Sequence, residues 1–533
     1  MNGKTEIAAQ NTPWIKQVAI QLTVPSLGDN TADVDRLVKG LRHQLEGAHI
    51  RVDFSSVKHL SRDLRACNYS VEAAVYRDGD RWHLIDVFDP EETKTLYGLS
   101  LDLGSSTLVL RLVDLSTGET ADEISFNNPQ IEIGTDILTR IHFAGREGGL
   151  SELQSLVLVE INHKIDGLLK DNHVIRKSIV GMTVAGNTTM THLFLGLDPH
   201  WICREPYIPV VNRLDVMSAR QLGLEINPEA PVLVFPNVGS YFGGDLIAGI
   251  LASKMTEREE VSFLVDVGTN AEVVIGNQDW LMACAGAAGP ALEGGVADMG
   301  MMAAPGVIDR VVIDPETGAF TIGTIPERNA SPAAENQGPL GICGSGLIDL
   351  VSQLFLVGMI DLRGKFVPDR CGERLIKKDG IAHLTVVPTD ASGTGQPLTL
   401  SQIDIDGLIR SKAAMYTILT TISKTVNIAF DEIGRFFVAG TFGSYINPRS
   451  AINIGMIPDL PLDTYVSLGN TSLAGAVMAL LGSDAQKSLF QIRDRITYLE
   501  LNVNQEFMNL FSAAKFLPHT DRSLFPSVKR LAD

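Results

Sequence analysis

Two short stretches with the same pattern constrain this chain more than any other feature of its sequence. Residues 101–107 read LDLGSST and residues 265–272 read VDVGTNAE. In each, an aspartate stands between apolar residues and is followed by a glycine and then by hydroxyl or amide side chains. Both stretches lie in apolar, β-branched runs that reach a turn signal, STG at 116–118 or GN at 276–277, and then continue. Such runs predict a β-hairpin at each place.

A hairpin of this composition suits phosphate binding. Gly104 and Gly268 let the backbone approach an anion, and successive N–H groups in a tight turn form an anion-binding concavity. The polar side chains beside these glycines are Ser105, Ser106, Thr107, Thr269 and Asn270. Asp102 and Asp266 can hold Mg²⁺ through water, because this ion prefers oxygen ligands and keeps several waters. One copy could be an ordinary structural turn, but two copies predict a nucleotide between two related halves.

The composition is that of an ordinary globular protein. Its 533 residues, 45% apolar and 20% charged, predict roughly two to four domains. A formal net charge of −19 argues against general binding to nucleic acid or anionic membranes, but not against a phosphate site built from backbone amides. The five cysteines are scattered, so we expect reduced thiols and no zinc or iron–sulfur site. A polar N-terminus and the lack of a long apolar run predict a cytoplasmic protein without a membrane span.

The first part of the chain predicts a small α+β domain at 13–95, after a flexible tail at 1–12. Its expected elements are a strand at 16–24, a helix beginning at Thr31 or Asp33, a strand at 49–54, a helix at 55–66 and a hairpin at 71–87. His59, Cys67 and His83 are scattered and form no catalytic constellation. We therefore expect this domain to dock a partner.

Two later turns are candidates for ligand contact in the first half of the chain. A buried strand at 178–184 runs into AGNTTM at 185–190, which places Asn187 and Thr188 where ligands of α/β folds gather. An ordinary helix cap explains this turn equally well. Asp245 stands at a helix start just before the second hairpin, where it could orient water or a metal ion, or could cap the helix.

Glycine-rich turns also follow the second hairpin. The Gly/Ala-rich stretch at 283–295, which contains Gly289 and Glu293, would let a nucleotide come close to the backbone. The last such turn, after a strand at 436–438, should contact adenine or adenosine; its residues are Gly440, Thr441, Phe442 and Gly443. Cys343, between glycines at a helix start, has no partner nearby in sequence and is expected to be structural. We further expect two helices within 399–430 and a helical structure over the last hundred residues.

The order of these features resembles the acetate and sugar kinase, heat-shock chaperone and actin superfamily (ASKHA). The resemblance covers 101–533 and implies an α/β fold of two duplicated, actin-like lobes with ATP and Mg²⁺ in the cleft between them. With the α+β domain in front, the ATPase domain is expected at 96–533, lobe one at about 96–255 plus the C-terminal helices and lobe two at about 256–450. In the chaperones of this superfamily an acidic residue starts the helix just before the second phosphate hairpin, near the attacking water. Asp245 stands at the matching place in this sequence. Residues 284–289, followed by Glu293, resemble the nucleotide-binding turn of the activators of 2-hydroxyacyl-CoA dehydratases.

Five stretches over nearly the whole chain resemble the reductive activators of corrinoid proteins more closely. They are PSLGDNTAD at 25–33, NNPQ at 127–130, AGNTTM at 185–190, AGPALEG at 288–294 and LPHTD at 517–521. The resemblance implies ATP-dependent reduction of a Co(II) corrinoid to Co(I) in a methyltransferase system, with a corrinoid protein as partner. A homodimer is one assembly open to the chain, but the sequence does not fix the oligomeric state. A small-molecule kinase with Asp245 as base, and an adaptor with a vestigial nucleotide site, are the alternatives.

The cysteines depart from that family in one respect. Its members carry an iron–sulfur module before the first domain or after the last, and neither cysteine set occurs in this sequence. The chain is thus either a truncated piece or a natural ATPase core. In both cases the resemblance implies that no cluster resides in this chain. Electrons would come from the missing iron–sulfur module in the first case and from a separate ferredoxin-type donor in the second.

Overall fold

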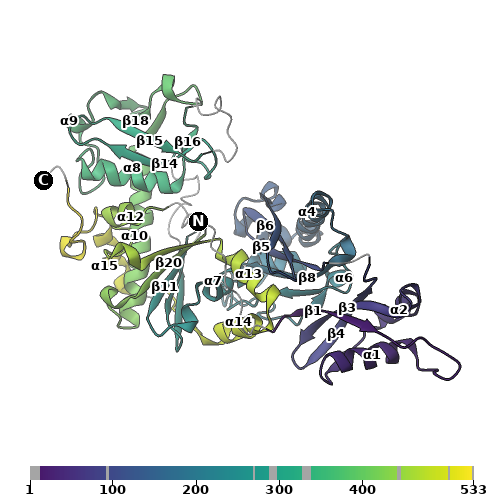
Figure 1. The fold of residues 1–533 in the computed structure, drawn as a ribbon. Coiled ribbons are helices and arrows are strands. Elements are labelled where there is room, and N and C mark those ends of the chain that lie inside the picture. Colours follow the sequence, from purple (N-terminus) through teal and green to yellow (C-terminus); the bar gives the residue numbers. More distant parts are fainter. Residues whose placement is uncertain are drawn as a thin grey trace. The chain divides into compact units, whose positions relative to one another are not determined.

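The computed structural model (Figure 1) describes residues 12–91, 95–267, 271–286, 297–326, 338–440, 446–501 and 505–530. The chain divides into two compact units. Unit 1 consists of residues 1–252 and 471–494, and unit 2 of residues 253–470 and 495–533. Nearly all of the expected N-terminal tail lies outside the described residues. The domain limits expected from the sequence stay predictions.

The N-terminal part of unit 1 is an α+β sandwich with its own core. Its sheet has the order β1-β3-β4-β2. The strands are β1 (Ile15–Gln21), β2 (His49–Arg51), β3 (Ser70–Asp78) and β4 (Arg81–Phe88), and the helices are α1 (Asp33–Gln44) and α2 (Phe54–Ala66). Leu37 and Leu41 on α1, and Leu60 and Leu64 on α2, are buried because leucines four residues apart share one helix face.

A mixed six-stranded sheet forms the rest of unit 1, in the order β7-β6-β5-β8-β10-β9. Its strands are β5 (Tyr97–Leu103), β6 (Thr107–Asp114), β7 (Thr120–Asn127), β8 (Ile179–Gly186), β9 (Met217–Ser218) and β10 (Pro231–Val234). The helices that bear on the site are α4 (Gly149–Asp171), α5 (Thr188–Leu195), α7 (Gly244–Ser253) and α13 (Thr471–Leu481). Every residue of β8 is buried, as expected for a central strand with parallel neighbours on both sides.

Unit 2 contains a second sheet that follows the same plan. Its order is β21-β20-β11-β12-β13-β22. The strands are β11 (Ser262–Val267), β12 (Ala271–Gly276), β13 (Leu281–Gly286), β20 (Arg435–Ala439), β21 (Tyr465–Gly469) and β22 (Ile496–Tyr498). In both sheets three antiparallel strands, β5 to β7 or β11 to β13, are extended by strands parallel to the first, β8 and β10 or β20 and β21. The duplication expected from the repeated sequence pattern is therefore present in the topology.

Two smaller sheets and a set of helices complete unit 2. The sheet β15-β14-β16 is covered by α8 (Gly344–Leu356), and the sheet β17-β18-β19 comes next along the chain (Figure 1). Their strands are β14 (Val307–Ile313), β15 (Phe320–Thr324), β16 (Gly341–Ile342), β17 (Leu375–Lys378), β18 (Ile381–Val387) and β19 (Leu398–Ser401). The Asp349 carboxylate of α8 accepts hydrogen bonds from Val311 N (2.7 Å) and from Ser450 Oγ (2.5 Å), the latter on α12 (Pro448–Ile454).

Two expectations about the later part of the chain were wrong. Instead of two helices within 399–430, one helix, α10 (Gln402–Thr425), follows β19. No proline interrupts this stretch, and Ser401 begins it with a capping box in which Ser401 Oγ accepts a hydrogen bond from Asp404 N. The last hundred residues also contain the strands β21 and β22, besides α13, α14 (Ser483–Arg495) and α15 (Gln505–Ala514). Short edge strands of this kind depend on a neighbouring strand and leave little local signal.

A buried lysine ties α10 to the segment that follows α15. The Lys412 side chain is fully buried, and its Nζ donates to the carbonyls of Phe516 (2.6 Å) and Pro518 (2.7 Å). We predict that Lys412→Met lowers the free energy of unfolding by about 2–3 kcal/mol, because two buried carbonyls lose their donor. Chemical denaturation measures this, and the surface change Lys365→Met, which breaks an exposed pair with Asp406, should cost less than about 1 kcal/mol.

The same lysine predicts a pH dependence. Burial lowers the pKa of Lys412 well below its usual value. In the unfolded chain Lys412 stays protonated up to its ordinary pKa of about 10.4. In the folded chain it loses its proton at a lower pH, so between the two pKa values only the unfolded chain carries this proton. The stability of the wild type relative to Lys412→Met should rise as the pH is raised from about 8 to about 10. A difference in Tm between the two proteins that stays constant over this range would contradict the assignment.

Candidate functional site

The turn between β5 and β6 is built around Gly104. A Cβ placed on Gly104 would lie 2.3 Å from the carbonyl oxygen of Thr107, so no side chain fits there. Asn128, just after β7, holds the turn: its Nδ2 donates to Gly104 O (2.9 Å) and its backbone N to Ser106 O (2.9 Å). Asn128 is 1% exposed. The sequence indicated NNPQ only as a stretch that resembles the family, whereas in the structure Asn128 of this stretch holds the turn in shape.

The hydroxyl groups of the turn are available to a ligand. Ser105, Ser106 and Thr107 are partly exposed, and within the described residues their hydroxyls have no hydrogen-bond partner. Three such donors beside a glycine with no room for a side chain fit the oxygens of a phosphate group. The residues present thus suit the triphosphate expected from the sequence.

Asp102 stands near the end of β5, two residues before Gly104. It is paired with Val109 on β6 and with Ala185 on β8, and its Oδ1 accepts a hydrogen bond from Ser472 Oγ of α13 (2.7 Å). Ser472 was not among the residues singled out in the sequence. The hydrogen bond joins residues 370 positions apart, so no local pattern could have indicated it.

The turn from β8 into α5 lies next to the first turn, because Leu103 and Gly186 are register partners. Asn187 Oδ1 caps α5 by accepting from Met190 N (2.9 Å), and Thr188 Oγ1 donates to Gly239 O (3.1 Å). Both side chains thus already have protein partners. A contribution of this turn to a ligand would come from backbone N–H groups at the start of α5.

Asp245 lies beside that same turn. It is the second residue of α7, and Leu246 N donates to its Oδ1 (2.9 Å). A Cβ placed on Gly243 would lie 2.3 Å from the Cα of Asn187 and 2.6 Å from Asp245 Oδ1. The absence of a side chain at Gly243 therefore lets the Asp245 carboxylate approach the β8–α5 turn. Unit 1 brings Asp102, the turn 104–107, Asn187, Thr188 and Asp245 to one edge of its sheet.

The second aspartate has a matching environment within unit 2. Asp266, near the end of β11, is paired with Ala439 on the parallel strand β20, as Asp102 is with Ala185. Gly440 follows with φ of +79°, and a Cβ placed on it would lie 2.9 Å from Asp266 Oδ1. In both sheets an aspartate thus lies beside an Ala-Gly turn of the parallel neighbour. The other residues predicted in unit 2 lie outside the described residues: Gly268, Thr269, Asn270, Gly289, Glu293, Thr441, Phe442 and Gly443.

The described residues offer few side chains that could bind a metal ion. Among the described residues, no three His, Cys, Asp or Glu side chains come together as a metal site. A Mg²⁺ ion at Asp102 would be of the kind that keeps several waters and shares one or two carboxylates with substrate phosphates. None of the described helices is long and apolar enough to cross a membrane.

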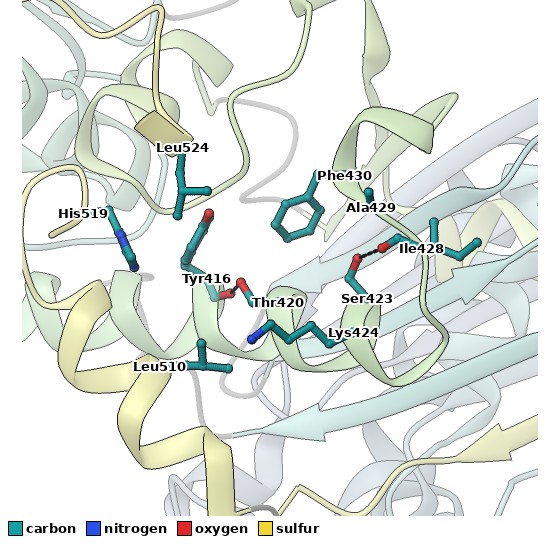
Figure 2. A pocket seen from close by; sticks show the side chains of 10 residues that line it. All are labelled: Tyr416, Thr420, Ser423, Lys424, Ile428, Ala429, Phe430, Leu510, His519 and Leu524. Atoms are coloured by element: carbon teal, nitrogen blue, oxygen red, sulfur yellow. Dashed lines mark hydrogen bonds between the residues drawn. The ribbon is translucent and has the colours of Figure 1, made fainter. Parts of the chain in front are cut away.

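A pocket of about 350 Å³ within unit 2 has a different character (Figure 2). It is lined by Tyr416, Thr420, Ser423, Lys424, Ile428, Ala429, Phe430, Leu510, His519 and Leu524. The Tyr416 ring lies 5.6 Å from that of His519 and 6.0 Å from that of Phe430, and burial raises the pKa of Tyr416 to about 12. Burial also lowers the pKa of His519. These mostly apolar walls suit an uncharged group rather than a triphosphate, and no predicted site residue lines them.

Comparisons with known proteins agree with this geometry. Sequence models of three consecutive regions match: the RACo linker region at 4–94, the RACo middle region at 97–258 and the C-terminal ASKHA domain of RACo at 260–529. A solved structure described as a reductive activator for corrinoid, iron-sulfur protein superimposes with a TM-score of 0.87 at 37% identity, covering 98% of this chain and 81% of that chain.

Two curated relatives point the same way. The corrinoid activation enzyme RamQ of Eubacterium limosum is 28% identical over 472 residues, which cover 86% of this chain and 76% of the relative. The [Co(II) methylated amine-specific corrinoid protein] reductase of Methanosarcina barkeri is 24% identical over 444 residues, 78% of this chain and 76% of the relative. The α/β ASKHA fold and the family expected from the sequence are confirmed. The chain belongs to the RACo family of reductive corrinoid activators.

Proposed function

We propose that this protein is an ATP-dependent reductive activator that drives a corrinoid protein from Co(II) to Co(I) in a methyltransferase system. Membership of the RACo family supports the reaction, as do the names of the two curated relatives. The observation that carries the ATP-dependent part is the turn 104–107, where three hydroxyls without a protein partner follow an aspartate and a glycine. Hydroxyls that have no partner within the protein can donate to the phosphate oxygens of ATP.

In this proposal the electron comes from a ferredoxin-type donor. Reducing one Co(II) to Co(I) takes one electron, which a ferredoxin-type donor gives up, while ATP and water become ADP and phosphate. Cys284 and Cys371 are buried, and burial raises their pKa to about 12 and about 11, so the thiolate form that binds iron is disfavoured. The chemistry of these thiols supports a donor that carries its own iron–sulfur cluster.

The residues take the following roles in the proposal. The turn 104–107 binds phosphate oxygens through hydroxyl and backbone donors, and the residues around Asp266 act in the same way in unit 2. Asp102 and Asp266 hold Mg²⁺, which when bound neutralises phosphate charge, and Asp245 orients the attacking water. Gly440 to Gly443 contact the adenosine.

ATP can favour electron transfer only by its difference in affinity between two states of the activator, so hydrolysis must be coupled to binding of the corrinoid protein. We place this reaction in the cytoplasm, with a homodimer as the proposed assembly.

The proposal is tested by following the visible spectrum of a Co(II) corrinoid protein with this chain and an external low-potential reductant. Conversion to Co(I) should require ATP and should be at least about 100-fold slower with Asp266→Ala, because the Mg²⁺ ion that neutralises phosphate charge loses a carboxylate that holds it. ATP hydrolysis without any spectral change, accompanied by a phosphorylated small molecule, would instead support the kinase alternative.

Substitution of Asp245 distinguishes a role in hydrolysis from a role as a helix cap. We predict that Asp245→Asn lowers the kcat of ATP hydrolysis by about 10²–10⁴-fold, because the amide cannot accept the proton of the attacking water. The KM for ATP should change much less. If Asp245 only capped α7, kcat would stay near the wild-type value and the variant would lose no more than about 2 kcal/mol of stability.

Asn128 is expected to act on ATP affinity through the shape of the turn. In Asn128→Ala the carbonyl of Gly104 loses its donor, so the turn has to be ordered by the ligand itself. We predict that the Kd for ATP rises by about 5–30-fold, the equivalent of about 1–2 kcal/mol. Asn172→Ala removes a similar amide from the end of α4, where it donates to Asp122 and Leu168, and should leave the Kd unchanged. Equal affinities in all three proteins would show that Asn128 has no part in nucleotide binding.

A further inference from the structure

Helix α13 begins with a residue that contacts a proposed metal-binding carboxylate. The hydroxyl of Ser472, in the first turn of α13, donates to Asp102 Oδ1 at 2.7 Å. Ser472 is 7% exposed, so water has little access to replace this contact. The hydrogen bond holds one oxygen of the carboxylate, Oδ1, in place.

The rest of α13 is anchored on the same part of the sheet. Four residues after Ser472, the carbonyl of Ala476 accepts a hydrogen bond from Thr183 Oγ1 (2.9 Å), which lies 3.0 Å from Ser100 Oγ. Ser100 and Thr183 are fully buried. This polar contact therefore sets the position of α13 along both β5 and β8.

A third contact follows one further turn along the helix. A Cβ placed on Gly98 of β5 would lie 2.8 Å from both terminal methyl carbons of Leu480, so the glycine makes room for this leucine. On α7, the carbonyl of Ala248 lies 2.3 Å from where a Cβ of Gly475 would be. Glycines at the two contacts let α13 approach both the sheet and the helix that carries Asp245.

These contacts have matching spacings. Residues 472, 476 and 480 follow each other at about 6 Å along a helix, since each residue rises about 1.5 Å. Two of their partners, Asp102 and Gly98, lie on β5, and the third, Thr183 on β8, is the register partner of Ser100. Positions 102, 100 and 98 follow each other at about 6.7 Å in the opposite direction. Because the two rises agree to within about 1 Å, the contacts at Thr183 and Gly98 hold Ser472 opposite Asp102.

We propose that Ser472 is a positioning residue that holds the Asp102 carboxylate in the orientation that receives Mg²⁺ with ATP. This inference rests on the role proposed above for Asp102. Loss of the hydroxyl removes the contact at Oδ1, so the ion has to contribute more to ordering the carboxylate when it binds. We expect the effect to fall on the dependence on Mg²⁺ and not on nucleotide binding in its absence.

The test compares three full-length variants with the wild type. In Ser472→Ala the Mg²⁺ concentration for half-maximal ATP hydrolysis should rise about tenfold, the size expected for losing a hydrogen bond to a charged group. Thermal stabilisation by ATP in EDTA should be unchanged, and Ser472→Thr should restore the wild-type Mg²⁺ dependence. Ser483→Ala is the matched control: this buried serine, at the start of α14 in the same unit, donates to Thr12 O (3.0 Å) and should have no effect on Mg²⁺.

Asp102→Asn separates failure of the inference from failure of the proposed site. If Asp102→Asn raises the Mg²⁺ requirement and Ser472→Ala behaves like Ser483→Ala, the positioning role is overturned and the site stands. If Asp102→Asn leaves the Mg²⁺ requirement unchanged, the proposed role of Asp102 is wrong. Thr183→Val, which removes the next anchor of α13, decides the question if Ser472→Ala does not fold. It should raise the Mg²⁺ requirement by about two- to threefold, and no change would contradict the inference.

Discussion

The parallel pairing of β5 with β8 is the constraint on which the candidate site depends. Because parallel strands end at the same edge of a sheet, the turn after β5 and the turn after β8 become neighbours, with Leu103 opposite Gly186. Asp102 and Asp245 then approach this edge from different elements, one at the end of a strand and one at the start of a helix. Three glycines, at 104, 186 and 243, leave no room for a side chain where these backbones meet. The polar groups can come close together because glycine has no side chain at these three positions.

The second sheet repeats this arrangement with other residues. Asp266 opposite Ala439 corresponds to Asp102 opposite Ala185, and in each case a glycine follows the alanine. The correspondence extends to strand order and direction, so it reflects the geometry of the whole sheet and not a chance similarity of two turns. The residues that follow each glycine differ between the two copies in the sequence: Asn187 and Thr188 after Gly186, Thr441 and Phe442 after Gly440.

The sequence predicted those parts of the fold and site whose signal is local. Apolar runs ending in glycine located β5, β8, β11 and β20, since a strand and the turn that follows it are encoded by adjacent residues. The division of 399–430 into two helices failed, because a helix without proline can continue wherever tertiary packing supports it. Ser472 was missed for a different reason: its partner lies 370 residues away, and a lone serine at a helix start resembles any cap. Asn128 lay within a recognised motif, but its hydrogen bonds to the turn became visible only when β7 was paired with β6.

The charge of the protein explains why the position of one carboxylate should matter. The stretches 97–110, 185–195 and 236–253, which form the edge of the site in unit 1, contain no lysine or arginine, and the whole chain carries a formal charge of −19. A triphosphate at this edge would meet neutral donors, two aspartates and a negative overall field. Hydroxyl and amide groups can orient the phosphates but cannot neutralise them, so the balance has to come from the metal ion. The ion must then be held by carboxylates whose own orientation is fixed. Ser472 donates a hydrogen bond to one of them, Asp102, and the other contacts of α13 with the sheet keep Ser472 in this place.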